Sequence, residues 1–351
     1  MTNTTWRRIA DDPGLHDSLL IRARALRETR EWFWNRGFIE VDTPVLAPWA
    51  GMEPHLVPMH TDVGDGIGRI TLHHQTSPEY ALKKLLAAGM PDCFSLVPAF
   101  RNDERGPLHE PEFTILEWYR LGNDYTALMD DTADFSADLA RSVRGTTTIE
   151  YGGKRADLAA DWERVTVADA MRTHAGVDIE SHADDESLRA HAREMGHDWV
   201  RDETWETLFF KLFIQHVEPN LGVGTPTILC EYPERFGALA RRKPGDARVV
   251  ERFETYVCGV ELCNAFSELT DATEQRVRLE REHVERAKIG ADSVPVDEDF
   301  LDAVADLPEC TGNALGMDRL IMLIAGEQNI QRVRWFPFSV FRAWNDRHNR
   351  R

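Results

Sequence analysis

Residues 109–120 combine aromatic, acidic and phenolic side chains in one short run, HEPEFTILEWYR. In a pleated strand successive side chains alternate between faces, so one face would carry Phe113, Ile115, Glu117 and Tyr119. A carboxylate buried between aromatic rings is costly unless a cation meets it. The segment therefore predicts a ligand that carries an ammonium group or, equally, an internal ion pair between Glu117 and an arginine.

A second concentration of carboxylates lies in residues 251–268, ERFETYVCGVELCNAFSE. A two-residue turn at 258–259 predicts a hairpin in which Glu254 lies opposite Cys263 and diagonal to Glu261. Diagonal neighbours on one face of a sheet are about 7 to 8 Å apart, so their long side chains can converge. Two converging carboxylates suit a hard cation, and Mg²⁺ held by carboxylates together with substrate phosphates is a common arrangement.

The simple pleat of this hairpin has one inconsistency. It places Asn264, Phe266 and Glu268 on the face opposite Glu261. An extra residue in the strand would turn these side chains to the same face. We therefore predict a β-bulge near Leu262 or Cys263.

Small residues surround an arginine in residues 310–322, CTGNALGMDRLIM. Small side chains let the backbone approach a ligand closely, and Arg319 at the start of an apolar helix could clamp an anion. Glycines before a helix more often form only a turn, and this segment alone favours that interpretation. The sequence has no glycine-rich phosphate loop of the GxxxxGK[ST] or GxGxxG type, so arginines and a metal ion would have to hold any nucleotide.

The elements that must position these residues follow from hydrophobic periodicity and turn residues. The patterns predict helices over 16–36, 77–89, 272–289 and 320–325. They predict strands over 38–41, 55–60, 69–73, 94–101, 112–120, 227–232 and 249–266. Residues 124–216 are predicted to be a helical insertion with one strand-like patch near 147–151. Strands joined by short links, with helices outside them, predict an α+β fold: one domain over 1–351 whose antiparallel sheet is flanked by helices.

The composition excludes several classes of protein. The 351 residues include 41 Lys and Arg against 60 Asp and Glu, a formal net charge of −19, which disfavours extended binding of nucleic acid. Basic clusters at 241–243 and 347–351 are more simply solvent-exposed charge. No apolar run is long enough for a membrane helix or a signal peptide, so we expect a cytoplasmic protein without a membrane partner. Five scattered cysteines without a CxxC pair predict reduced packing residues.

Together the three chemical segments resemble the signature motifs of class II aminoacyl-tRNA synthetases, in their lysyl branch. FIEVDTP (38–44) resembles motif 1, FRNDE (100–104) followed by HEPEFTILEWYR resembles motif 2, and GNALGMDRL (312–320) resembles motif 3. TSPEY (76–80) and GVELCNAFSELTDA (259–272) are similar to lysine-site segments of that branch. The similarity covers almost the whole chain from about residue 16, and it implies the class II catalytic core as the fold.

The resemblance also implies ATP and Mg²⁺ as cofactors and a role for individual residues. Arg101 and Arg319 would be catalytic, the first holding the α-phosphate and the second the terminal phosphates. The nucleotide would be bound by Arg101, Asn102, Asp103, Glu104, His109, Glu110, Phe113, Glu261, Leu262, Gly316 and Arg319. The diamino acid would be surrounded by Ser77, Pro78, Glu79, Glu117, Tyr119, Asn264, Phe266, Glu268 and Ala314. The metal would be bound by Glu254 and Glu261.

Four positions depart from the usual pattern of the family. Glu110 stands where Asn is usual, Asp103 where Glu is usual, and Asn313 where a small or apolar residue is common. Ala314 stands where lysyl-tRNA synthetases usually have glycine. One added methyl group in a pocket can change discrimination by roughly 1 to 3 kcal/mol, enough to favour a substrate whose amino group has moved.

The start of the chain points to one subgroup. Only about 15 residues precede the first predicted core helix, whereas lysyl-tRNA synthetases carry an anticodon-binding barrel there. The chain therefore resembles most the truncated paralogues that activate (R)-β-lysine with ATP and transfer it to a lysine of elongation factor P, and VEPNLG (217–222) resembles them too. Lysine activation with transfer to tRNA, itself disfavoured, or to a small acceptor is the alternative, and a regulatory paralogue that binds an amino acid without activating it is a third. Motif 1 implies a homodimer.

Overall fold

The computed structural model describes residues 5–53, 56–64, 66–197, 203–291 and 294–348. Its strands are β1 (Ile39–Glu40), β2 (Leu46–Ala47), β3 (His60–Gly64), β4 (Arg69–His74), β5 (Cys93–Phe100), β6 (Glu112–Leu121), β7 (Thr148–Tyr151), β8 (Lys154–Asp157), β9 (Glu163–Thr166), β10 (Thr227–Pro233), β11 (Arg242–Lys243), β12 (Asp246–Val257), β13 (Val260–Ser267) and β14 (Cys310–Gly316). Its helices are α1 (Thr5–Ala10), α2 (Pro13–Trp34), α3 (Glu79–Ala87), α4 (Tyr125–Arg144), α5 (Val167–Ala170), α6 (Asp185–Glu194), α7 (Trp205–Leu212), α8 (Ala272–Lys288), α9 (Glu298–Ala305), α10 (Met317–Ala325) and α11 (Phe338–His348).

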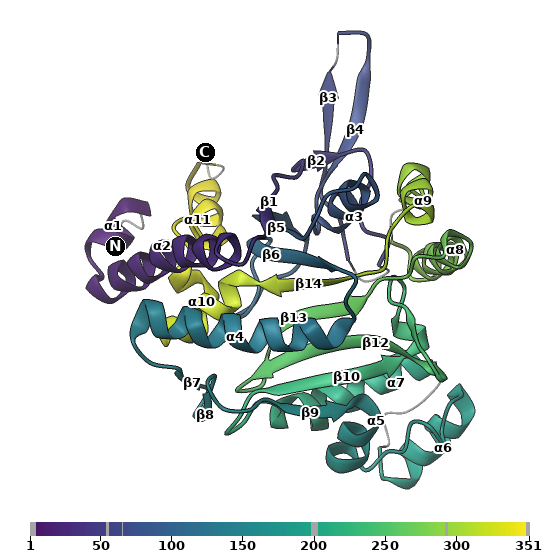
Figure 1. Cartoon of the computed structure of the whole chain (residues 1–351). Coiled ribbons are helices and arrows are strands. Elements are labelled where there is room, and N and C mark those ends of the chain that lie inside the picture. Colours follow the sequence, from purple (N-terminus) through teal and green to yellow (C-terminus); the bar gives the residue numbers. More distant parts are fainter. Residues whose placement is uncertain (1–4, 54–55, 65, 198–202, 292–293, 349–351) are drawn as a thin grey trace.

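One large sheet organises the described residues (Figure 1). Its nine strands follow the order β1-β5-β6-β14-β13-β12-β10-β9, with β11 beside β12. All neighbouring pairs are antiparallel except β1 with β5 and β9 with β10, at the two ends of the sheet. The predicted α+β fold with helices outside a largely antiparallel sheet is confirmed.

The segment before α10 is a strand rather than a turn. Residues 310–316 form β14, which pairs with β6 on one side and β13 on the other. The interpretation of its glycines as turn residues was therefore wrong. A Cβ at Gly312 would collide with the ring of Tyr119 on the neighbouring strand. The small residue is needed because a cross-strand side chain occupies the space above it.

The hairpin of β12 and β13 carries both carboxylates of the second segment. Its turn residues at 258–259 have φ of 55° and 78°, as a type I′ turn requires. Beyond the turn, Leu262 is an extra residue of β13 without a partner in β12, so the predicted β-bulge is confirmed. The bulge shifts the register and places Glu254 opposite Asn264, and the expected pairing with Cys263 was wrong.

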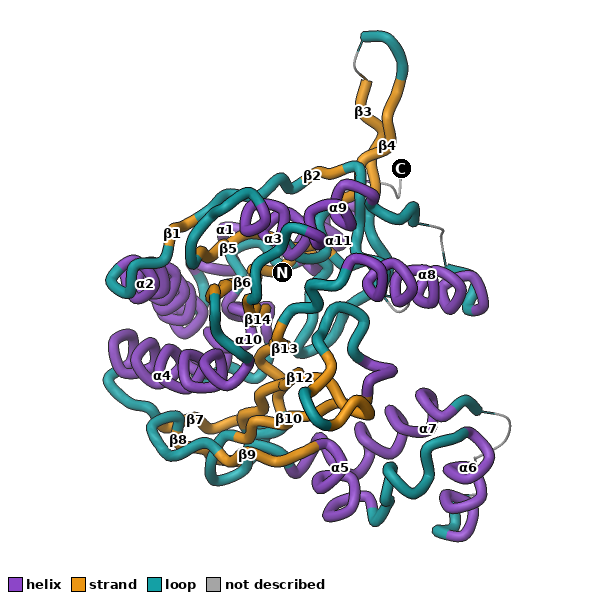
Figure 2. Tube along the Cα trace, turned by 45° about the vertical axis from the view of Figure 1, so that its right-hand side comes forward, coloured by secondary structure: helices purple, strands orange, loops and turns teal. Residues whose placement is uncertain are grey.

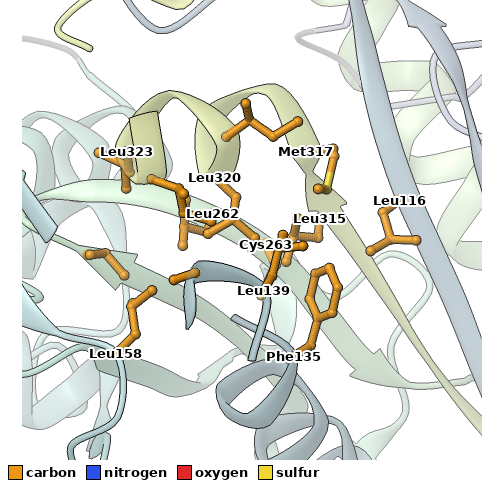
Figure 3. Packing of buried hydrophobic residues seen from close by; sticks show 14 of the residues in the cluster. Leu116, Phe135, Leu139, Leu158, Leu262, Cys263, Leu315, Met317, Leu320 and Leu323 are labelled. Atoms are coloured by element: carbon orange, nitrogen blue, oxygen red, sulfur yellow. The ribbon is translucent and has the colours of Figure 1, made fainter. Parts of the chain in front are cut away.

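The main hydrophobic core lies between one face of the sheet and the helices α2, α4 and α10. Alternation along β6 directs Leu116 and Trp118 into this core, and both are fully buried. Figure 3 shows how Leu320 of α10, Leu315 of β14 and other apolar side chains meet there. Because period two is strict along the strand, the intervening residues of β6 face the other side of the sheet.

Residues 124–216 contain more strand than the sequence suggested. They hold α4 to α7, and besides β7 they contain β8 and β9, the last of which pairs with β10 at the edge of the main sheet. The helices α5, α6 and α7 gather away from α2 and α4 (Figure 2) and share a second core with the sheet, around Trp205, Phe209 and Tyr256. Whether 124–216 is an insertion stays a prediction.

Smaller differences concern element ends. The strand expected from position 55 begins at His60, and position 55 itself lies outside the described residues. The helix expected from Ser77 begins at Glu79, whose backbone N–H donates to the Ser77 hydroxyl (3.1 Å). All five cysteines are buried and free of disulfides. Among the described helices, none combines the length and apolar character needed to cross a membrane.

Candidate active site

A cavity of about 370 Å³ opens on the face of the sheet that carries Glu117. It is lined by Glu53, Ser77, Glu79, Arg101, Glu104, Leu108, His109, Glu110, Phe113, Ile115, Glu117, Tyr119, Arg252, Glu254, Glu261, Leu262, Asn264, Phe266, Gly312, Asn313, Ala314, Gly316, Asp318, Arg319 and Ile330. All the residues predicted for the site line this cavity except Pro78, Asn102, Asp103 and Glu268. Segments far apart in the sequence thus meet at one place.

Glu117 is a deeply buried carboxylate of the lining, with 2% of its surface exposed. It accepts hydrogen bonds from the Ser77 hydroxyl (2.6 Å) and the Tyr119 hydroxyl (2.7 Å). Burial and the charge of Glu79 outweigh these two bonds and raise the pKa of Glu117 to about 8. None of the described residues forms an ion pair with it, so the arginine pairing considered from sequence is absent there, and an added cation would stabilise the ionised form.

Lys83 of α3 neutralises the two neighbouring carboxylates. Its ammonium lies 2.5 Å from Glu79 Oε1 and 2.5 Å from Glu268 Oε2. Although burial opposes it, the charges of Glu268 and Glu79 raise the pKa of Lys83. Glu268 is therefore placed behind the cavity, as the partner of an internal lysine. The sequence reasoning missed Lys83, although its position four residues after Glu79 on a helix is a recognisable ion-pair spacing.

The bulge in β13 brings the remaining amino-acid-site residues to the cavity. Asn264 and Phe266 both line it together with Glu261, as the predicted bulge requires. In the sheet, Ala314 of β14 lies between Glu117 on one neighbour and Asn264 on the other. The methyl group of Ala314 therefore sits in the row of side chains that forms the cavity floor.

Two arginines occupy the other end of the cavity. The Arg101 guanidinium lies 5.1 Å from the centre of the Phe113 ring, and its Nε is buried without a hydrogen-bond partner among the described residues. Arg319 donates to the backbone oxygen of Glu261 (2.9 Å) and to His109 Nε2 (2.7 Å). Burial and the Arg319 charge lower the pKa of His109, which keeps its ring neutral and able to accept this bond. A buried arginine N–H without a partner is suited to an anion such as a phosphate.

Glu110 has a structural partner in addition to its place in the lining. It is 4% exposed and accepts a hydrogen bond from the backbone N–H of Phe338, the first residue of α11 (2.6 Å). Burial raises the pKa of Glu110. The carboxylate at this position thus holds the start of the last helix. Asn102 and Asp103 lie outside the lining, so their role in nucleotide binding stays a prediction.

The two predicted metal ligands differ in how free their oxygens are. Glu254 accepts from the Tyr232 and Tyr256 hydroxyls (both 2.6 Å) and from Arg252 Nη2 (2.7 Å). Glu261 is partly exposed, and one of its oxygens lies 3.3 Å from Arg319. In the described part of the chain, no three His, Cys, Asp or Glu side chains are arranged as metal ligands. Glu261 therefore fits a Mg²⁺ ion that takes most of its ligands from phosphates and water, and Glu254 fits less well.

Several residues in or near the site had no role assigned from the sequence, among them Glu53, Arg252 and Glu218. Glu53 and Arg252 line the cavity. Glu218 lies outside the lining, next to Gly259 in the turn between β12 and β13, and burial and the charges of Glu261 and Glu254 raise its pKa. The sequence around Glu53 and Glu218 has no hydrophobic periodicity that would mark either residue. Arg252 has the pattern of an ordinary charged residue on a strand. Only the folded arrangement brings these three to the site.

Comparisons with known proteins identify the family to which this chain belongs. The family model of class II tRNA synthetases (D, K and N) matches residues 3–340. An elongation factor P–(R)-β-lysine ligase of Proteus mirabilis (strain HI4320) is 40% identical over 331 residues, which cover 93% of this chain and 96% of the relative. The protein with the same name from Klebsiella pneumoniae (strain 342) is 38% identical over 344 residues, 97% of this chain and 98% of the relative. The chain therefore belongs to the class II aminoacyl-tRNA synthetase family, in the group that includes the elongation factor P–(R)-β-lysine ligases.

Proposed function

We propose that this chain is an ATP-dependent ligase that activates (R)-β-lysine as an aminoacyl-adenylate and transfers it to a lysine side chain of elongation factor P. The observation that carries the proposal is the polarity of the cavity. One end holds Glu117, a buried carboxylate without a cationic partner among the described residues, and the other end holds Arg101 and Arg319. A molecule with ammonium groups at one end and an anionic reacting group at the other matches this arrangement. The names of the relatives above supply the amino acid and the acceptor.

The residues of the acidic end would select the amino acid. Glu117, fixed by Ser77 and Tyr119, would bind the terminal ammonium group. Charge-assisted hydrogen bonds of this kind contribute about 1.5 to 3 kcal/mol each. The methyl group of Ala314 would narrow the floor beside Glu117 and favour an amino acid whose second amino group is displaced from the usual position.

The arginines of the other end would stabilise the activation step. A carboxylate oxygen of the amino acid attacks the α-phosphorus of ATP, a P–O bond forms, and the bond to the pyrophosphate oxygen breaks. Arg101 and Arg319 offset the negative charge that develops, and the cavity holds the two reactants in line. Phe113 would stack on the adenine. Mg²⁺, when bound at Glu261, would neutralise part of the phosphate charge.

The second step needs no nucleophile from this chain. The uncharged amine of the acceptor lysine attacks the acyl carbon, the amide bond forms, AMP leaves, and the ammonium proton is lost to solvent. This sequence of bond changes is complete with ATP, the amino acid and the acceptor.

Activation and transfer can be tested separately. ATP–pyrophosphate exchange should be faster with (R)-β-lysine than with α-lysine. Arg101→Ala should lower kcat/KM by a factor that corresponds to at least about 1.5 to 3 kcal/mol, the free energy of a charge-assisted hydrogen bond. Co-expression with elongation factor P should add the mass of one lysyl unit to one of its lysines. Wild-type exchange in Arg101→Ala would contradict the role of that arginine. Charging of tRNA without modification of elongation factor P would favour the alternative function.

A homodimer and a cytoplasmic reaction complete the proposal. Large apolar side chains of α2 and β1 are exposed in the single chain, with Leu20 at 46%, Trp34 at 52% and Ile39 at 44%. This region contains the motif 1 segment, which supports a contact between two copies. Sedimentation should give the mass of two chains, and a monomer at micromolar concentration would remove this part of the proposal.

A further inference from the structure

The carboxylates at the acidic end of the cavity are not equally neutralised. Lys83 pairs with Glu79 and with Glu268. Glu53 and Glu117 also belong to this end, and no ion pair joins either of them to another described residue. Two carboxylates therefore remain for cations from outside, and a diamino acid carries two ammonium groups.

Glu53 is held against the amino-acid site by its surroundings. The loop that carries it is fixed by buried Arg286 of α8, which donates to the backbone oxygens of Glu53 (2.8 Å) and Leu56 (2.9 Å). Glu53 Oε2 is buried and has no hydrogen-bond partner among the described residues. A Cβ at Gly51 would collide with this oxygen and would come within 2.8 Å of the Thr76 hydroxyl. The missing side chain at Gly51 thus leaves the space that the Glu53 carboxylate fills.

The loop that carries Glu53 lies beside Arg101, because the backbone N–H of Asn102 donates to the backbone oxygen of Val57 (2.9 Å). Glu117 lies four residues along β6 from Phe113, the ring against which Arg101 packs. The electrostatic neighbours of the two carboxylates agree with this order. Burial and the charge of Glu79 raise the pKa of Glu53, and the Arg101 charge opposes the rise. Burial and Glu79 also raise the pKa of Glu117, and the groups that oppose the rise are Ser77, Tyr119 and Lys83. Arg101 belongs to the end where the amino acid reacts. Glu53 is therefore the carboxylate nearer the reacting group, and Glu117 is the more distant one.

We propose that Glu53 is a specificity-determining residue that binds the amino group nearer the reacting carboxyl, while Glu117 binds the terminal ammonium group. This inference rests on the proposed function and deepens it. In β-lysine, which is 3,6-diaminohexanoic acid, Glu53 faces the 3-amino group. A buried carboxylate left without its partner is penalised, so an amino acid lacking that group is rejected.

The test compares two substrates that differ only in this amino group. 6-Aminohexanoic acid keeps the carboxyl and the terminal ammonium of β-lysine and lacks the 3-amino group. Wild type should prefer β-lysine in ATP–pyrophosphate exchange, and Glu53→Gln should reduce the ratio of the two kcat/KM values about tenfold or more, mainly by weakening β-lysine. Glu117→Gln should weaken both substrates and leave the ratio much closer to that of wild type.

Two further variants control for folding and for general electrostatic effects. Gly51→Ala keeps the Glu53 carboxylate but displaces it, so it should lower the ratio as Glu53→Gln does, and it decides the matter if Glu53→Gln loses all exchange. Glu282→Gln removes a carboxyl of α8 that interacts with Glu53 but does not line the cavity, and it should keep the wild-type ratio.

The outcomes separate the inference from the function. Wild-type activity with β-lysine together with an unchanged ratio in Glu53→Gln and Gly51→Ala overturns the inference alone. If Glu282→Gln lowers the ratio of the two kcat/KM values as much as Glu53→Gln does, the inference is also overturned, because any nearby negative charge would then produce the preference for β-lysine. Absence of β-lysine-dependent exchange in wild type overturns both.

Discussion

Binding of the diamino acid should release a proton from Glu117 at pH 7, and Glu117→Gln should reduce that release; any release that remains would come from Glu53, whose pKa is also raised. Burial and the charge of Glu79 raise the pKa of this carboxyl to about 8. At pH 7 about nine in ten molecules are then protonated in the free protein. An ammonium group beside it favours the charged form and lowers the pKa well below 7. The expected release from Glu117 is therefore the larger part of one proton per bound molecule at pH 7, and less at pH 8.

Isothermal calorimetry in buffers of different ionisation enthalpy measures this number directly. Wild type and Glu117→Gln should be titrated with (R)-β-lysine at both pH values. Burial raises the pKa of Glu268 to about 8 as well, but this carboxylate lies outside the cavity lining and already faces the Lys83 ammonium at 2.5 Å, so the ligand changes its protonation less. Release below about 0.3 proton in wild type, or equal release in the variant, would show that Glu117 is already ionised or does not meet the ligand cation.

Three other predictions concern stability and the shape of the cavity. Lys83→Met should lower the free energy of unfolding in urea by roughly 3 to 5 kcal/mol, because it leaves buried Glu268 and partly buried Glu79 without their cation. Lys84→Met on the same helix should cost less, since that ammonium is more exposed, and equal losses would contradict the role of the buried pair. Gly312→Ala should abolish β-lysine-dependent exchange, because the added methyl group displaces the Tyr119 ring, and normal exchange kinetics would refute this account of the glycine. In the folded protein the pKa of Glu117 is raised above its ordinary value of 4.5, so the stability that this group contributes is fully present below pH 4.5 and is lost as the pH rises through about 8. Between pH 5 and 8 the Glu117→Gln variant should therefore gain stability relative to wild type, by up to several kcal/mol. If the difference in free energy of urea unfolding between the two proteins did not change with pH, that would count against the raised pKa.

Local patterns predicted the parts of the site that depend on neighbours in sequence. Alternation along β6 placed Glu117 and Tyr119 on one face, and the conflict in the simple hairpin register predicted the bulge at Leu262. These features follow from strand geometry and turn chemistry, which act over a few residues. Motif spacing then indicated the family that the comparisons show.

Long-range pairing was harder to predict from the sequence. The glycines of β14 fit a turn as well as a strand, and the place of β14 in the middle of the sheet depends on β6 and β13. The pairing of Glu254 with Asn264 differs from the simple register because one extra residue shifts every pair beyond it. Such choices are settled by packing of distant segments, for which the sequence carries no local signal.

The sequence by itself determined the family, the faces of its central strands and the presence of an acidic and an arginine-bearing segment. Only the tertiary structure decided which groups pair with one another. Lys83 forms ion pairs with Glu79 and Glu268, and Glu110 accepts a hydrogen bond from the first residue of α11. The physical reason is that burial makes every unpaired charge costly, so partners are set by which side chains are enclosed together. The carboxylates left over after this internal pairing are the ones available to a ligand.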